Sequence, residues 1–166
     1  MDIAERVAKM SYAKRLQVGA VIVKEGRIIS MGWNGMPPGW DNKCEETRWH
    51  ADSEEETQVT KPQVMHAESN AISKLAKSNE SGLGAVLYCT HNPCMDSAKL
   101  ILQSGIKKVY YQDEYRDSGG IKFLNADIKM ETERMIDHRV NPSDDPPSTF
   151  NGGLSWNEQY PDTAGA

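Results

Sequence analysis

The sequence predicts an α/β fold in which a central sheet is covered by helices on both faces. Two observations lead to this prediction. Helical and strand periodicities alternate along the chain in the order α-β-β, a long irregular segment, then α-β-α-β-α-β. The length of 166 residues suits one well-packed domain and is too short for two of ordinary size. We predict that this domain spans 1–140, followed by a polar tail at 141–166.

The first three elements are a helix and a hairpin. Within 2–14, Ile3, Val7 and Met10 recur at helical spacing, with acidic residues near the start and basic residues near the end, as the helix dipole favours. A β-branched run at 19–23 and a second apolar run at 27–33 flank the turn pair Glu25-Gly26. These two runs predict a β-hairpin.

The second half alternates helices with strands. Apolar residues at helical spacing predict a helix from His66 to about Lys77 and another from Cys94 to Ser104. The remaining predicted elements are strands at 85–90 and 108–111, a short helix at 120–125 and a weaker strand at 127–130.

The segment 34–63 lacks a helical or strand pattern. Its first part, 34–42, is dense in Asn, Gly and Pro, and acidic runs follow at 45–46 and 54–56. Loops of this length inside a compact domain are uncommon and are usually functional. We therefore predict a long functional loop.

The composition excludes several classes of protein. The formal net charge of −5 disfavours binding of polynucleotides through their phosphates, although one phosphate needs only one or two cations. No stretch approaches the roughly 20 apolar residues of a membrane span. The odd number of cysteines, three, and the absence of an apolar N-terminal signal favour a reducing, cytoplasmic location.

Two short motifs predict chemistry. His66-Ala67-Glu68 opens one helix and Pro93-Cys94-Met95-Asp96-Ser97 opens the next. An imidazole and thiolates form tetrahedral zinc sites that keep one position for water, and zinc lowers the pKa of that water. A nearby glutamate can then transfer protons. Taken singly, His66 could cap a helix and Cys94 could fill a core. The pairing of the two motifs across a helix and a strand favours zinc chemistry.

The chain resembles the deoxycytidylate deaminases of phages and bacteria over roughly residues 1–131. The matching segments are 17–23, 32–37, the His66-Ala67-Glu68 trio, 90–94 and 114–117. The resemblance implies a three-layer α/β/α sandwich with a central mixed five-stranded sheet, like that of cytidine deaminases. It also implies zinc-dependent hydrolysis of dCMP to dUMP and ammonia, with His66 and Cys94 as metal ligands and Glu68 as the catalytic proton carrier.

Position 97 departs from the family pattern, which has cysteine there. Cys94 and Ser97 share one helix face, so Ser97 stands where the second sulfur is expected. A hydroxyl is a harder and much less acidic group than a thiol, and zinc seldom selects it. Three alternatives follow: Ser97 impairs the enzyme, Ser97 still helps to hold zinc more weakly, or Cys89 or His91 replaces it. We favour weakened but surviving zinc binding.

The resemblance also implies substrate-binding roles. Asn34 would bind the sugar, although an ordinary type I′ turn is the alternative, and Ala67 would also contact substrate. Tyr115 would stack on the pyrimidine, and Arg116 would pair with the 5′-phosphate or simply be a surface cation. Lys14 and Arg15 are further phosphate candidates, with a surface helix end as the plainer interpretation.

The resemblance implies regulation and assembly as well. The expected effectors are dCTP with Mg²⁺ as activator and dTTP as inhibitor, near Gly32, Asn34, Gly35 and Met36. The expected assembly is a homo-hexamer. Competing functions are a deaminase that also acts on dCTP, a nucleotide-binding protein weakened at Ser97, and a nucleic-acid editing deaminase, which the acidic charge disfavours.

Overall fold

A computed structural model describes residues 1–50, 55–115, 117–127 and 130–136. The chain divides into two units, Met1–Ile136 and Asp137–Ala166, and the first contains every described element. The predicted tail 141–166 lies outside the described residues. The elements are α1 (Asp2–Ala8), β1 (Gly19–Lys24), β2 (Arg27–Trp33), β3 (Glu45–His50), β4 (Glu55–Thr60), α2 (Ala67–Leu75), β5 (Val86–His91), α3 (Met95–Gln103), β6 (Lys108–Asp113), α4 (Gly119–Asn125) and β7 (Glu131–Arg134).

The main sheet has five strands in the order β2-β1-β5-β6-β7. β1 runs antiparallel to both of its neighbours, β2 and β5, whereas β5, β6 and β7 are mutually parallel. Helices connect the parallel strands, as such crossovers require. The predicted mixed five-stranded sheet is therefore confirmed.

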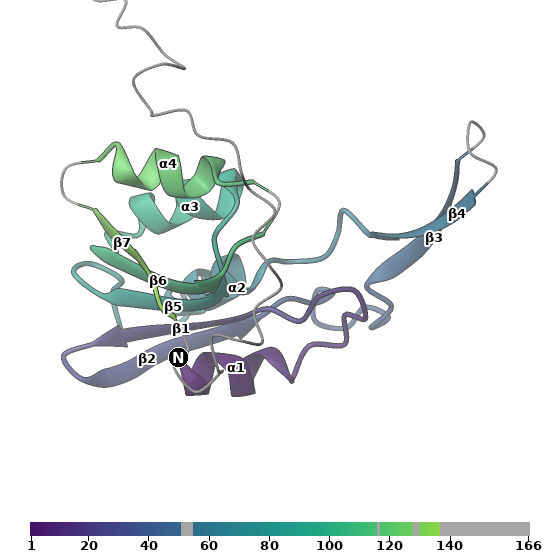
Figure 1. The fold of residues 1–166 in the computed structure, drawn as a ribbon. Coiled ribbons are helices and arrows are strands. Elements are labelled where there is room, and N and C mark those ends of the chain that lie inside the picture. Colours follow the sequence, from purple (N-terminus) through teal and green to yellow (C-terminus); the bar gives the residue numbers. More distant parts are fainter. Residues whose placement is uncertain (51–54, 116, 128–129, 137–166) are drawn as a thin grey trace, which may run out of the picture. The chain divides into compact units, whose positions relative to one another are not determined.

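The strands bury side chains on both faces, which makes the unit three-layered (Figure 1). On β1, Ala20 and Ile22 face the larger core shared with α2, α3 and α4, whereas Val21 faces α1. This alternation follows the period of two along a strand. The predicted α/β/α arrangement is confirmed, and it brings the N-termini of α2 and α3 to the same side of the sheet.

The predicted loop 34–63 contains a β-hairpin. β3 and β4 pair antiparallel as a separate two-stranded sheet (Figure 1), with Glu45 opposite Thr60 and Arg48 opposite Thr57. Every described side chain of β4 except Val59 is exposed. Because the hairpin buries no apolar face, its sequence shows no alternation of apolar and polar residues, and the pattern that predicts strands is missing.

Two further boundaries differ from the prediction. The last strand is Glu131–Arg134 rather than 127–130, of which 128 and 129 lie outside the described residues. This edge strand is polar, and Lys108 on β6 forms ion pairs with Glu131 and Glu133 at 3.3 and 3.1 Å.

The first helix ends at Ala8 rather than at 14, because the chain turns at Ser11. The Ser11 hydroxyl accepts a hydrogen bond from the Ala13 N–H and donates one to the Asn34 carbonyl.

Two glycines allow the close backbone approaches that position the site. A Cβ at Gly32 would lie 2.3 Å from the Ala67 carbonyl oxygen, so β2 contacts the first turn of α2 directly. A Cβ at Gly120 would lie 2.1 Å from the Pro93 carbonyl oxygen, so α4 packs on the backbone that precedes α3. Larger residues at either position would push apart the elements that hold His66 and Cys94. Within the described part of the chain, we find no helix long and apolar enough to cross a membrane.

Candidate active site

His66 and Cys94 occupy equivalent places in the fold. Each is the N-cap residue of its helix, α2 or α3, with an extended backbone conformation. Residues in this position precede the first turn of the helix, whose N–H groups lack intrahelical partners and supply a positive partial charge. The two side chains thereby meet at a site favourable for a thiolate.

Three potential ligand atoms converge there. His66 Nδ1 lies 3.3 Å from Cys94 Sγ and 3.3 Å from Ser97 Oγ, and the sulfur lies 3.6 Å from the hydroxyl oxygen. Tetrahedral zinc, with bonds of about 2.0–2.3 Å, separates its ligand atoms by roughly 3.3–3.8 Å. The spacing of the three atoms thus fits three corners of a tetrahedral zinc site, although the hydroxyl is a weaker donor than the two other groups.

The ionisation of Cys94 suits metal binding. The hydrogen bond with His66 lowers the pKa of the Cys94 thiol to about 7, although burial acts in the opposite direction. The same hydrogen bond raises the pKa of the His66 imidazole, which must lose its proton before it can bind a metal ion. A thiolate is the form of cysteine that binds metal ions. Cys94 is therefore prepared to act as a ligand near neutral pH.

Glu68 lies on the first turn of α2, beside these atoms, and only 4% of it is exposed. Burial raises the pKa of its carboxyl group above the ordinary value, and its own backbone N–H, His66 and the Ser97 hydroxyl counter this effect only in part. A carboxyl group with a raised pKa can take up and release a proton near neutral pH. This property is what proton transfer at an active site needs.

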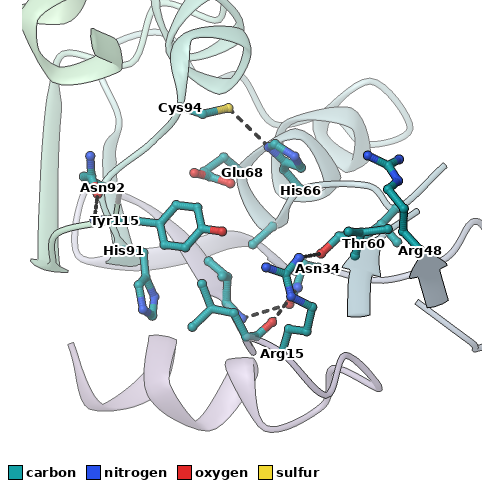
Figure 2. A pocket seen from close by; sticks show the side chains of 15 residues that line it. Arg15, Asn34, Arg48, Thr60, His66, Glu68, His91, Asn92, Cys94 and Tyr115 are labelled. Atoms are coloured by element: carbon teal, nitrogen blue, oxygen red, sulfur yellow. Dashed lines mark hydrogen bonds between the residues drawn. The ribbon is translucent and has the colours of Figure 1, made fainter. Parts of the chain in front are cut away.

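A cavity of about 400 Å³ opens onto Glu68, His66 and Cys94. Figure 2 shows Tyr115, His91 and Asn92 on one side of it, with Asn34, Arg15 and Arg48 on the other. The volume is within the range of small-molecule sites, and the buried carboxylate lies at its inner end. The cavity therefore offers a reactive end and a separate cationic end.

The aromatic side of the cavity is held by Asn92. The Asn92 side chain accepts a hydrogen bond from the Tyr115 N–H and donates one to the Asp117 carbonyl at 2.8 Å. The Tyr115 ring lies edge-on to His91, with 6.5 Å between the ring centroids. A ring held in this way presents an apolar surface on which a planar base could stack.

On the opposite side of the cavity, the Asn34 side chain joins two backbone segments by hydrogen bonds. Its side-chain oxygen accepts the Val18 N–H at 2.8 Å, and its amide nitrogen donates to the Leu16 carbonyl at 2.8 Å. Asn34 follows β2 and does not form the tight turn of a two-residue hairpin, which lies instead at Glu25 and Gly26. An amide can accept and donate one more hydrogen bond each, so contact with a ligand stays open to it.

Replacing Asn34 by alanine is expected to lower the free energy of unfolding by about 1–3 kcal/mol, because two backbone groups lose their partners in a partly buried place. Chemical denaturation measures this change. Asn34→Asp is the companion variant: it keeps the acceptor for Val18 but turns a second oxygen toward the Leu16 carbonyl, so only the bond to Val18 survives. A free energy for Asn34→Ala within about 0.5 kcal/mol of the unmodified protein would contradict the structural role.

The family follows from a direct comparison with known proteins. Residues 1–113 match the family model described as the cytidine and deoxycytidylate deaminase zinc-binding region. The chain belongs to this deaminase family. Both the family and the enzyme class predicted from the two motifs are thereby confirmed.

Relatives in this deaminase family include deoxycytidylate deaminases. That of Enterobacteria phage T4 is 36% identical over 147 residues, which cover 69% of this chain and 76% of the relative. That of Homo sapiens is 38% identical over 120 residues, which cover 71% of this chain and 65% of the relative. A solved structure of dCMP deaminase from the cyanophage S-TIM5, in complex with dCMP and dUMP, has a TM-score of 0.70 and 44% identity, over 81% of this chain and 92% of that one.

Because the family binds zinc, it matters whether Ser97 can replace a cysteine ligand. Ser97 is 1% exposed and lies next to His66 and Cys94, and its role as a metal ligand stays a prediction. Among the described residues, no three His, Cys, Asp or Glu side chains lie close enough to share a metal ion. Neither Cys89, which lies in the main core, nor His91 therefore completes a set of ligands with His66 and Cys94.

The remaining predicted residues have different outcomes. Ala67 and Tyr115 line the cavity. Arg116 lies outside the described residues, so its role stays a prediction. Gly35 pairs with Met65, directly before His66, while Met36 packs against a small separate core. Gly32 has a packing role on α2, and its predicted effector role stays a prediction as well.

Several cavity residues were not predicted. Asn92 lies within the matching segment 90–94, so the motif itself could have indicated it. His91, predicted only as an alternative metal ligand, lines the cavity as well. Arg48, Val59 and Thr60 come from the hairpin, and no signal in the sequence places them there, because their position depends on how β3 and β4 pair.

Proposed function

We propose that the protein catalyses the zinc-dependent hydrolytic deamination of dCMP to dUMP and ammonia. The observation that supports this most is the buried carboxylate of Glu68 beside the convergent His66, Cys94 and Ser97 atoms, at the inner end of a nucleotide-sized cavity. The solved cyanophage enzyme that resembles this chain was crystallised with dCMP and dUMP.

The proposed metal ligands are His66 and Cys94, with Ser97 as a weaker third. Their mutual distances suit zinc, and the low pKa of Cys94 supplies a thiolate. Zinc, when bound, acts as a Lewis acid that makes a water molecule nucleophilic near neutral pH. The hydroxyl of Ser97 predicts an affinity below that of a site with two thiolates.

Glu68 is the proposed proton carrier. In the hydrolysis, a water oxygen bonds to the ring carbon that bears the amino group, and the bond from that carbon to the amino nitrogen breaks. Glu68 would take a proton from the water and pass it to the ring nitrogen. It would then carry the second proton, from the hydroxyl that the water leaves on the carbon, to the departing amino nitrogen, so that ammonia leaves and the carbon keeps a carbonyl oxygen. Its raised pKa allows it to act as a base and then as an acid.

The cavity walls would orient the substrate. We assign Tyr115 to stacking on the pyrimidine, Asn34 to the sugar, and the N–H at Ala67 to the base, since first-turn amides of a helix lack intrahelical partners. Arg15, on the cationic side, is a candidate partner of the 5′-phosphate, as is Arg116.

We retain the regulation and assembly that the resemblance implies: activation by dCTP with Mg²⁺, inhibition by dTTP, a cytoplasmic homo-hexamer, and no nucleic-acid or membrane partner. The proposed effector segment contains Gly32, Asn34, Gly35 and Met36. Its pairing with Met65, next to His66, supports a mechanical link to the ligands. The three cysteines are free thiols, as a reducing compartment favours.

A second candidate function rests on Ser97. If the hydroxyl cannot hold zinc, the same cavity would bind nucleotides, including dCTP, without efficient turnover. This alternative keeps the binding surface and loses only the reaction.

Ammonia release separates the candidates. With zinc added, we expect turnover of dCMP to exceed that of dCTP, cytidine and single-stranded DNA, and we expect a chelator to abolish it and added zinc to restore it. The assay should be run with and without dCTP, dTTP and Mg²⁺, to test the effectors. Tight binding of dCMP without ammonia release at saturating zinc would favour the second candidate.

A further inference from the structure

We propose that Arg48, on the β3–β4 hairpin, is a specificity-determining residue that binds the substrate's phosphate together with Arg15. The inference rests on the proposed function and deepens it. Through Arg48, the hairpin would make the protein bind a pyrimidine nucleotide more tightly than the same nucleoside without its phosphate.

The strand register directs Arg48 toward the cavity. Residues that pair across the hairpin lie on the same face, and so do residues two positions apart on one strand. Arg48 lies two positions after Glu46, and Glu46 pairs with Val59. Arg48 and Val59 therefore lie on the same face of the hairpin. Both line the cavity, and Figure 2 shows Arg48 beside it. Trp49 belongs to the opposite face and is 59% exposed. The face that carries Arg48 and Val59 is therefore part of the site. From the opposite face of the described hairpin residues, only Thr60, at the base, lines the cavity.

Hydrogen bonds fix the base of the hairpin to the segment that carries Arg15. The Glu45 carboxylate accepts the backbone N–H groups of Lys14 and Arg15 at 2.9 and 3.2 Å. The Arg15 guanidinium donates to Thr60 Oγ1 at 3.0 Å. Arg48 lies three residues beyond Glu45, about 10 Å along an extended strand. The two guanidinium groups are thus held on the same side of one cavity.

Buried packing reinforces this attachment. Cys44, directly before β3, is fully buried in a small cluster with Ala13 and Val64, and its carbonyl accepts the Lys61 N–H at 2.9 Å. An isolated two-stranded hairpin is only marginally stable in water, so this base is what orients it.

The charges complement a phosphate. Among the described residues that line the cavity, Glu68 is the only carboxylate, and Arg15 and Arg48 are the only lysine or arginine side chains. No ion pair joins Arg48 to another described residue. A phosphate monoester carries about −1.5 to −2 charges at neutral pH, and guanidinium groups bind its oxygens bidentately. In a chain of net charge −5, two arginines at one cavity mark an anion-binding end.

Equilibrium binding of dCMP and deoxycytidine tests the inference, measured by calorimetry on the full chain with zinc added. Every form that is compared also carries Glu68→Gln, so that the ligand is not hydrolysed during the titration. Arg48→Ala is expected to weaken dCMP binding by about 10- to 100-fold and to change deoxycytidine binding by less than about twofold. Arg48→Lys, which keeps the charge but loses the planar fork, should lose about 3- to 10-fold for dCMP. Two control variants should bind like the unmodified protein: Arg27→Ala, an arginine paired with Glu80, and Trp49→Ala, on the other face of the hairpin.

Each other outcome is decisive. Unchanged dCMP binding in Arg48→Ala would overturn the inference. An equal loss of affinity for dCMP and deoxycytidine in Arg48→Ala would overturn it too, as would a loss of dCMP affinity in Trp49→Ala as large as that in Arg48→Ala. Either of these losses would indicate that the hairpin has only a structural role. Melting temperatures of all variants identify any that fail to fold, and Arg48→Lys then replaces Arg48→Ala in the comparison. Ammonia release tests the proposed function separately: a chain that binds dCMP through Arg48 but releases no ammonia refutes the reaction and leaves the phosphate contact standing.

Discussion

Replacing Glu68 by glutamine is expected to lower kcat for dCMP by about 10²- to 10⁴-fold, the usual range for the loss of a positioned proton carrier. Glutamine has nearly the same shape, so the first turn of α2 and the ligand atoms His66 and Cys94 should stay in place. The affinity for dCMP should change only slightly. Steady-state ammonia release measures kcat, and calorimetry on the zinc-free proteins, in which dCMP is not hydrolysed, measures the affinity.

A stability measurement distinguishes this catalytic role from a structural one. Because burial raises the pKa of Glu68, folding favours its protonated form, and ionisation of the carboxyl costs stability as the pH rises through the folded-state pKa. In zinc-free protein near pH 8, Glu68→Gln should therefore unfold at the same or a higher temperature. A variant that melts earlier while retaining most of its kcat would contradict the assignment.

Replacing Ser97 by cysteine is expected to raise the affinity for zinc by about 100-fold or more, since a thiolate replaces a hydroxyl that zinc seldom selects. The position is already suitable: Ser97 Oγ lies 3.3 Å from His66 Nδ1 and 3.6 Å from Cys94 Sγ. The larger sulfur must fit a site that is 1% exposed, so a small local shift is expected. Competition with a chelator of known affinity measures the binding, and kcat should rise with zinc occupancy.

Ser97→Ala is the matched control. It removes the hydroxyl without supplying a sulfur, and we expect zinc affinity below that of the unmodified protein if Ser97 contributes to the site. Equal zinc occupancy and equal turnover in the serine and cysteine forms would show that position 97 plays no part in metal binding. Equal zinc affinity in the serine and alanine forms would leave His66 and Cys94 as the protein ligands.

The hairpin shows where reasoning from sequence stops. Residues 45–50 and 55–60 combine β-branched and charged side chains, and neither strand has an apolar face to bury. Their pairing depends on backbone hydrogen bonds and on the anchored base at Cys44 and Glu45, both of which involve residues distant in sequence. The acidic runs indicate a solvated loop for the same reason, and nothing in the local sequence singles out Arg48.

The sequence by itself determined the elements of the main sheet apart from its last strand and the end of its first helix. It also determined the deaminase family and pointed to His66, Glu68 and Cys94. This was possible because periodic burial and short motifs at helix starts depend on local spacing, which folding preserves. Only the tertiary structure decided that Ser97 stands with His66 and Cys94 at mutual distances that suit a zinc site. It also decided that Arg15 and Arg48, 33 positions apart, line one cavity, because that depends on strand register and on contacts between distant segments.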